Sequence, residues 1–152
     1  MEIIWITGDT HGGWIHRLNM DSFPEQREMT KDDYVIVLGD FGIWRDSPQQ
    51  RWYLNWLEEK HFTTLFIDGN HENYDILDSY PVEEWHGGKV HFIKPSIIHL
   101  MRGQVFEIDD LKFFTFGGAA SHDISDGVLE IDDPRVKEWR DDPDKMYRIN
   151  HI

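Results

Sequence analysis

Three short apolar runs each lead into a glycine that is followed by an acid or an amide, and the runs lie about 30 residues apart, a spacing that fits one crossover of a parallel sheet. The runs are residues 3–6, 34–38 and 64–67, and the pairs that follow are Gly8-Asp9, Gly39-Asp40 and Gly69-Asn70. Strand-length apolar runs that alternate with longer polar stretches are typical of βαβ units. We therefore expect an α/β fold with a parallel sheet at its centre.

Polar residues with metal-binding chemistry follow these three runs. In open α/β sheets the loops after the carboxyl ends of parallel strands converge on one crevice. Two carboxylates, two imidazoles and a carboxamide would then share one site: Asp9, His11, Asp40, Asn70 and His71. A structural turn needs the neighbouring glycines, but it needs neither the acids nor the histidines.

The second half of the chain follows a different pattern. Four strand-like runs, at residues 90–93, 97–101, 104–108 and 112–116, are spaced too closely for crossovers and favour antiparallel hairpins. Asp109-Asp110 is a candidate two-residue turn between the last two runs. Helices are predicted at residues 14–20, 48–60, 74–77 and 134–140. A chain of 152 residues is the size of a single domain, which we assign to residues 1–152.

Composition excludes several classes of protein. The chain has 15 Lys and Arg against 29 Asp and Glu, a net charge of −14, which argues against a nucleic-acid partner. Cysteine is absent, so disulfides, thiolate zinc sites and a cysteine nucleophile are excluded, and any metal must be held by oxygen and imidazole. The N-terminus has no basic segment and no long apolar stretch. We expect a cytoplasmic protein without membrane association.

The three motifs resemble those of the calcineurin-like metallophosphoesterase family, whose pattern runs Asp-x-His, Gly-Asp and Gly-Asn-His-Asp/Glu. Each motif alone is weak, but all three occur in order, each at the end of a predicted strand. The later segment Gly117-Gly118-Ala119, with Ser121 and Asp123, is similar to bacterial and phage-type members. The resemblance implies a metallophosphoesterase-like β-sheet sandwich flanked by helices.

The resemblance also implies a set of roles. Asp9 and His11 would bind a first metal, Asp40 would bridge two metals and Asn70 would bind the second, while His71 would assist the leaving oxygen as the catalytic histidine. The cofactors would be two divalent ions, Mn, Fe or Zn. The reaction would be hydrolysis of a phosphomonoester or phosphodiester by a metal-activated hydroxide. The substrate would be a phosphorylated small molecule, a nucleotide or a phosphoprotein.

One part of the family pattern does not occur. Family members continue with a His-x-His pair that completes both metal sites, and this sequence contains none. We therefore expect the chain to be the N-terminal portion of a longer phosphoesterase, truncated at the C-terminus, rather than a naturally shortened form. The alternative function is a non-catalytic phosphoesterase-fold scaffold or protein-interaction module. A nucleotide-binding domain without hydrolysis is disfavoured, because no Gly-x-Gly-x-x-Gly or Walker-type loop follows the first strand.

Other residues have less specific signals. Arg45 could contact a phosphate oxygen or lie on the surface, and His122 is the best further candidate for lining the approach of the substrate. Glu72 is interpreted as a cap of the following helix. Trp52 and Trp56 are predicted to pack against the core. The histidines outside the motifs are expected to be surface or hydrogen-bonded structural residues.

Overall fold

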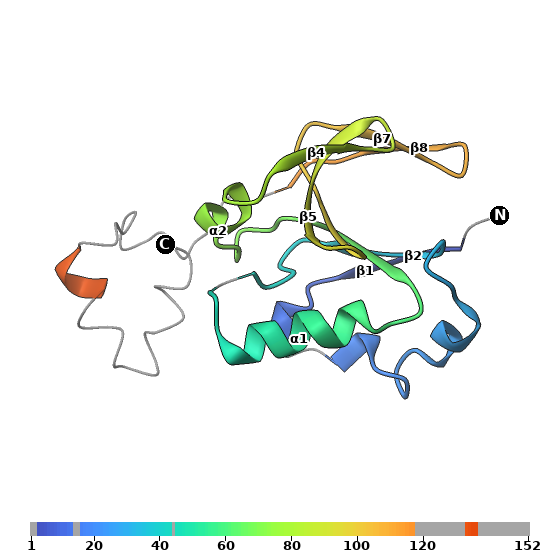
Figure 1. The fold of residues 1–152 in the computed structure, drawn as a ribbon, viewed down its shortest axis with the longest axis horizontal. Coiled ribbons are helices and arrows are strands. Elements are labelled where there is room, and N and C mark those ends of the chain that lie inside the picture. The colour runs from blue at the N-terminus through green and yellow to red at the C-terminus, as the bar shows by residue number, and fades with distance from the viewer. Residues whose placement is uncertain (1–2, 14–15, 44, 118–132, 137–152) are drawn as a thin grey trace.

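A computed structural model describes residues 3–13, 16–43, 45–117 and 133–136 of the chain (Figure 1). Its strands and α-helices are β1 (Ile4–Gly8), β2 (Tyr34–Leu38), α1 (Pro48–Glu58), β3 (Thr63–Ile67), α2 (Tyr74–Asp78), β4 (Val82–Trp85), β5 (Gly88–Lys94), β6 (Ile97–Leu100), β7 (Val105–Ile108) and β8 (Leu111–Phe114). Short 3₁₀ segments occupy His11–Gly13, His16–Leu18 and Pro24–Glu28. Most of the elements thus fall on the apolar runs of the sequence.

Within the described residues the larger sheet has six strands in the order β1-β2-β3-β6-β5-β4. The first four are parallel neighbours, and β5 and β4 join by antiparallel pairing. β7 and β8 form a separate antiparallel hairpin, closed by Asp109 and Asp110 with φ of 48° and 64°. Positive φ at both central residues is what a tight hairpin turn requires, so the predicted turn is confirmed.

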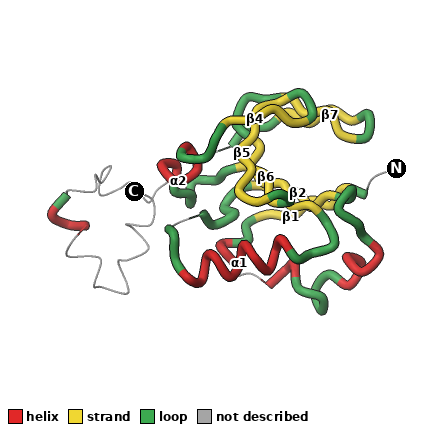
Figure 2. Tube along the Cα trace, viewed as in Figure 1, coloured by secondary structure: helices red, strands yellow, loops and turns green. Residues whose placement is uncertain are grey.

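The larger sheet is covered on both faces, which confirms the expected sandwich flanked by helices. Successive residues of a strand point to opposite faces, and in β2 both sets are buried. Val35 and Val37 pack with residues of α1, whereas Tyr34 and Ile36 pack with residues of β7. Figure 1 shows α1 on one side of the sheet and the β7–β8 hairpin on the other, and Figure 2 shows the same layers as strand and helix.

Helix α1 begins where the sequence predicts a cap. The Ser47 hydroxyl accepts a hydrogen bond of 3.1 Å from the Gln50 amide, and Pro48 occupies the first turn, where its missing N–H costs nothing. The helix buries Tyr53, Leu54 and Leu57. The expectation that Trp52 packs against the core is wrong, because Trp52 lies on the outer face and is 66% exposed. The prediction is confirmed for Trp56, which stacks on Trp52 and is a partly buried residue packed against the core.

Several other elements differ from the prediction. Where a helix was expected at residues 14–20, the described residues form only short 3₁₀ turns. Strand β4 was not predicted, because three of its four residues are exposed and it has no apolar run. The predicted helix at 134–140 is described only at 134–136, where the residues are helical. No helix among the described residues has the length and apolar character needed to cross a membrane.

Candidate metal centre

The polar loops leave the sheet at the same level. In the parallel register Gly8 lies opposite Leu38, and Leu38 lies opposite Ile67, so the last residues of β1, β2 and β3 form one row. The loops that follow carry Asp9, Asp40 and Asn70. The loops that carry the predicted ligands therefore start side by side, as the sequence predicts for parallel strands.

Three of the predicted ligands form a cluster. His11 Nε2 lies 4.0 Å from Asp9 Oδ2 and 3.8 Å from Asp40 Oδ2. One candidate ligand atom from each of the three residues lies within 4.8 Å of the others. Their side chains are 54%, 30% and 14% exposed for Asp9, His11 and Asp40, so the cluster has a buried end and an open end. Two carboxylates this close repel each other, and a cation between them removes that repulsion.

The first two loops are joined through their backbones. The amides of Thr10 and His11 both donate to Asp40 O, at 3.1 and 2.9 Å, and the Gly12 amide donates to Phe41 O at 2.8 Å. His11 and Asp40 have φ of 46° and 44°, a left-handed conformation that most residues avoid. Such conformations persist where the surrounding structure enforces them, and they concentrate at functional sites.

Glycine is required where the loops meet. Gly42 has φ of 105°, and a Cβ at this position would come within 2.1 Å of the Gly12 amide nitrogen. In the third loop, a Cβ on Gly69 would come within 2.0 Å of Asp40 Oδ1. The glycines of the motifs therefore allow the loops to touch, as the sequence suggested.

The third loop brings Asn70 and His71 to Asp40. The His71 amide donates a hydrogen bond of 3.0 Å to Asp40 Oδ1. The rings of His11 and His71 meet edge to face, with centroids 5.7 Å apart. Asn70 lies between two residues that touch Asp40, Gly69 and His71, so its backbone is held beside that carboxylate.

Glu72 has a different role from the predicted helix cap. Asn73 caps α2, and its side chain accepts from the Ile76 amide. The fully buried Glu72 carboxyl accepts instead from the amides of Phe41, Gly42 and Ile43, which tie the second loop to the third. Burial raises the pKa of Glu72 to about 8, although these backbone donors lower it. No local signal could reveal this contact, because it joins residues about 30 positions apart, as a crossover unit does.

Comparison with known proteins decides the family. A family model described as calcineurin-like phosphoesterase matches residues 3–151. The chain belongs to this family. Searches of curated proteins and of solved structures found no match. A calcineurin-like phosphoesterase is a metal-dependent hydrolase, and the Asp/His/Asp cluster is an oxygen and imidazole donor set that suits Mn, Fe and Zn.

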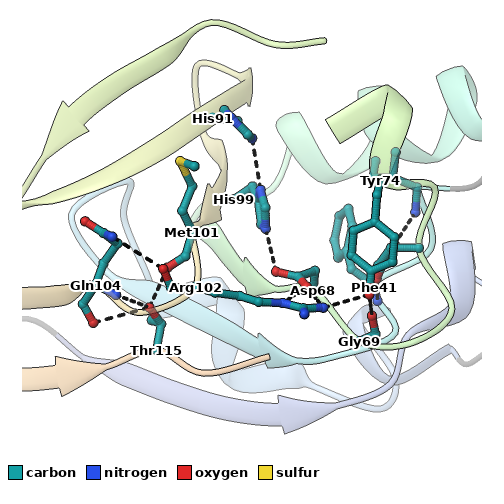
Figure 3. A network of polar contacts seen from close by, with 12 residues as sticks. Phe41, Asp68, Gly69, Tyr74, His91, His99, Met101, Arg102, Gln104 and Thr115 are labelled. Carbon is teal, nitrogen blue, oxygen red and sulfur yellow. Dashed lines mark hydrogen bonds and ion pairs between the residues drawn. The ribbon is translucent and has the colours of Figure 1, made fainter. Parts of the chain in front are cut away.

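A second polar group in this calcineurin-like phosphoesterase lies directly behind the third loop (Figure 3). The Asp68 carboxylate, 3% exposed, accepts from His99 Nε2 at 3.0 Å and from Arg102 Nε at 2.5 Å. Burial raises the pKa of Asp68, but these hydrogen bonds and charges outweigh it and hold the pKa below its usual value. Sequence reasoning missed this group, although Asp68 and Arg102 both follow apolar strands closely, as the predicted ligands do.

Two predicted substrate contacts of the phosphoesterase remain predictions. Arg45 is exposed in the turn before α1, where its amide donates to Gln50 Oε1 at 3.1 Å. His122 lies outside the described residues, together with Ser121 and Asp123. Among the histidines outside the motifs, His91 and His99 are buried and hydrogen-bonded to each other, as expected of structural histidines.

Proposed function

We propose that this member of the family hydrolyses a phosphomonoester or a phosphodiester at a binuclear metal site. The observation that carries the proposal is the clustering of Asp9, His11 and Asp40, whose candidate ligand atoms lie within 4.8 Å of one another. Residues from two separate loops form this cluster, and the backbone is left-handed at two of them, His11 and Asp40. Left-handed residues concentrate at functional sites, and here they bring three possible metal ligands together.

The residues have distinct roles in the proposal. Asp9 and His11 would hold one cation, Asp40 would be shared between two, and Asn70 would supply an amide oxygen to the second. Divalent cations in such a site act as Lewis acids toward a phosphoryl oxygen and make a water molecule acidic enough to attack phosphorus near neutral pH. The His71 amide donates to Asp40 Oδ1 and so restricts the orientation of this carboxylate, which supports a role as a ligand.

His71 and the substrate complete the proposal. The His71 ring, close to that of His11, would donate a proton to the leaving oxygen or stabilise its charge. Arg45 and His122 are proposed contacts of the substrate phosphate. A net charge of −14 favours a phosphorylated small molecule, a nucleotide or a phosphoprotein over a nucleic-acid polymer.

The test is hydrolysis of p-nitrophenyl phosphate and bis(p-nitrophenyl) phosphate by the 152-residue chain, with and without added Mn²⁺, Fe²⁺ or Zn²⁺. We expect metal-dependent release of nitrophenol from at least one substrate. The His71→Ala variant should lose about 100-fold or more in kcat while it still binds Mn²⁺ in calorimetry. The Asp40→Asn variant should lose both activity and Mn²⁺ binding.

Two results would contradict the enzymatic proposal. A folded chain that binds no divalent metal, or one that binds metal and hydrolyses neither substrate, would favour the scaffold alternative. Activity that survives in both variants would show that the catalytic centre lies elsewhere.

A further inference from the structure

We infer, on the basis of the proposed function, that Tyr74 and Arg102 are positioning residues that hold residues 69–71 against Asp40. Neither residue belongs to the three motifs, and neither is among the proposed metal ligands. Both lie at the edge of the sheet from which the ligand loops emerge: Tyr74 begins α2, and Arg102 follows β6, the parallel neighbour of β3.

The first step is the carbonyl that precedes Asn70. Tyr74 Oη donates a hydrogen bond of 2.5 Å to Gly69 O, and it accepts one of 2.7 Å from Arg102 Nη2 (Figure 3). On the other side of Asn70, the His71 amide donates to Asp40 Oδ1. The backbone of Asn70 is thus fixed at both flanking peptides, once by Tyr74 and once by Asp40.

The second step is the anchor of Arg102. The Nε and Nη2 atoms of Arg102 both contact Asp68 Oδ2. Its guanidinium carbon also lies over the ring of Tyr74, 5.2 Å from the ring centroid. The turn that carries Arg102 is itself held by Thr115, the residue that follows β8. Thr115 Oγ1 donates to Met101 O at 2.6 Å, and the Gly103 amide donates to Thr115 O at 2.8 Å. Both the side chain of Arg102 and the turn that carries it are therefore held in place beside residues 69–71.

The third step is the other side of the Asp68 carboxylate. A carboxylate only accepts hydrogen bonds, so His99 Nε2 carries the proton that it shares with Asp68 Oδ1. His99 Nδ1 in turn shares a hydrogen bond of 3.1 Å with His91 Nδ1. Asp68 is held from both sides, and Gly69 follows it directly.

The Tyr74→Phe variant tests the inference with little risk to the fold, because it removes one hydroxyl and leaves the Asp68 contacts intact. We expect Mn²⁺ affinity in calorimetry to fall about 10-fold and kcat to fall with KM unchanged. The melting temperature should change by no more than about 2–4 °C. Tyr80→Phe is the matched control, since the Tyr80 hydroxyl has no hydrogen bond to any residue that the structure describes.

Arg102 separates positioning from substrate binding. Arg102→Lys keeps the charge but cannot contact Asp68 and Tyr74 together, so we expect the same loss of Mn²⁺ affinity and kcat. Arg51→Lys, in an exposed ion pair with Asp46, is the control that should match the wild type. An Arg102→Lys variant with raised KM and unchanged Mn²⁺ affinity would overturn the inference and make Arg102 a substrate contact.

Amide exchange distinguishes failure of the inference from failure of the proposed function. Exchange of the His71 amide, measured without metal or substrate, should be about 10-fold faster in Tyr74→Phe than in Tyr80→Phe. Equal rates would overturn the inference whatever the activity of the wild type. A wild-type chain that neither binds Mn²⁺ nor hydrolyses ester would refute the proposed function, and the exchange rates would still decide whether Tyr74 holds the loop.

Discussion

Two residues of the site, His11 and Asp40, have a strained backbone conformation. His11 and Asp40 both have positive φ, and a residue in a sparsely populated backbone region costs of order 1–3 kcal/mol. Aspartate and histidine tolerate this region better than most residue types do. Their side chains leave the loops toward each other as a result, with His11 Nε2 3.8 Å from Asp40 Oδ2. The same two residues thus provide both the turn and the proposed ligands.

The contact between Gly69 and Asp40 gives a prediction at this scale. In Gly69→Ala the new methyl group would collide with Asp40 Oδ1 at 2.0 Å and with the Asp40 amide nitrogen at 2.3 Å. Because one of these atoms is backbone, the loops must separate, and we expect Mn²⁺ affinity to fall by about 10–100-fold in calorimetry. Gly8→Ala is the control, since its methyl would meet only Arg17 Nη1 at 3.8 Å. Equal affinities in the two variants would contradict the prediction.

At the scale of elements, the sequence was most informative where apolar runs end in glycine. Strands β1, β2 and β3 and the ligand-bearing loops were predicted from that pattern, because strand ends and sharp turns are determined locally. Strand β4 has exposed residues and forms only because it pairs with β5, so its signal lies in another segment. The contacts of Glu72, Asp68 and Arg102 also join distant residues, and local patterns could not predict them.

Strand β1 and the turn before β2 are joined by one carboxylate, which predicts a pH dependence. Asp33 Oδ1 accepts from the Ile3 amide at 2.8 Å and Oδ2 accepts from the Thr30 amide at 2.7 Å. The hydrogen bond from Ile3, more than any other contact, lowers the pKa of Asp33 below 3.8. The folded state therefore keeps this group ionised at a pH where the unfolded chain is already protonated. Its contribution to stability is complete above about pH 4 and is lost as the pH falls through the folded-state pKa.

Urea denaturation at a series of pH values checks this prediction. The free energy of unfolding of the wild type should fall more steeply below about pH 4 than that of Asp33→Asn. Asp32→Asn, at the exposed neighbouring residue, should follow the wild type. Parallel curves for wild type and Asp33→Asn would show that this carboxylate does not link β1 to the turn.

At the scale of the molecule, the residues that the structure describes form two apolar cores, one on each face of the larger sheet. The family resemblance implied the sandwich, but the sequence pattern did not indicate which segment covers which face, because a buried run such as residues 34–38 is apolar on both sides. The two faces of the β7–β8 hairpin differ in burial. Phe106 is fully buried and its ring occupies the space where a side chain on Gly88 would lie, whereas Phe114 is 66% exposed.

These two phenylalanines give a matched pair of variants at the scale of the molecule. Phe106→Ala should lower the free energy of unfolding by about 3–5 kcal/mol, because it removes a large side chain from the core between sheet and hairpin. Phe114→Ala should change it by no more than about 0.5 kcal/mol. Urea denaturation measures both. Similar losses in the two variants would mean that the hairpin does not cover the sheet through Phe106.

The position of β1 has a consequence for how the site comes apart. β1 is the outer strand of the sheet in the described part of the chain, and it pairs only with β2. Asp9 and His11 follow this strand, whereas Asp40 and Asn70 follow strands with neighbours on both sides. An edge strand frays at a lower free energy than the strands inside a sheet. A cation bound by both Asp9 and Asp40 would link the end of β1 to the end of β2. The order of β1 would then depend on the metal ion that its own loop helps to bind.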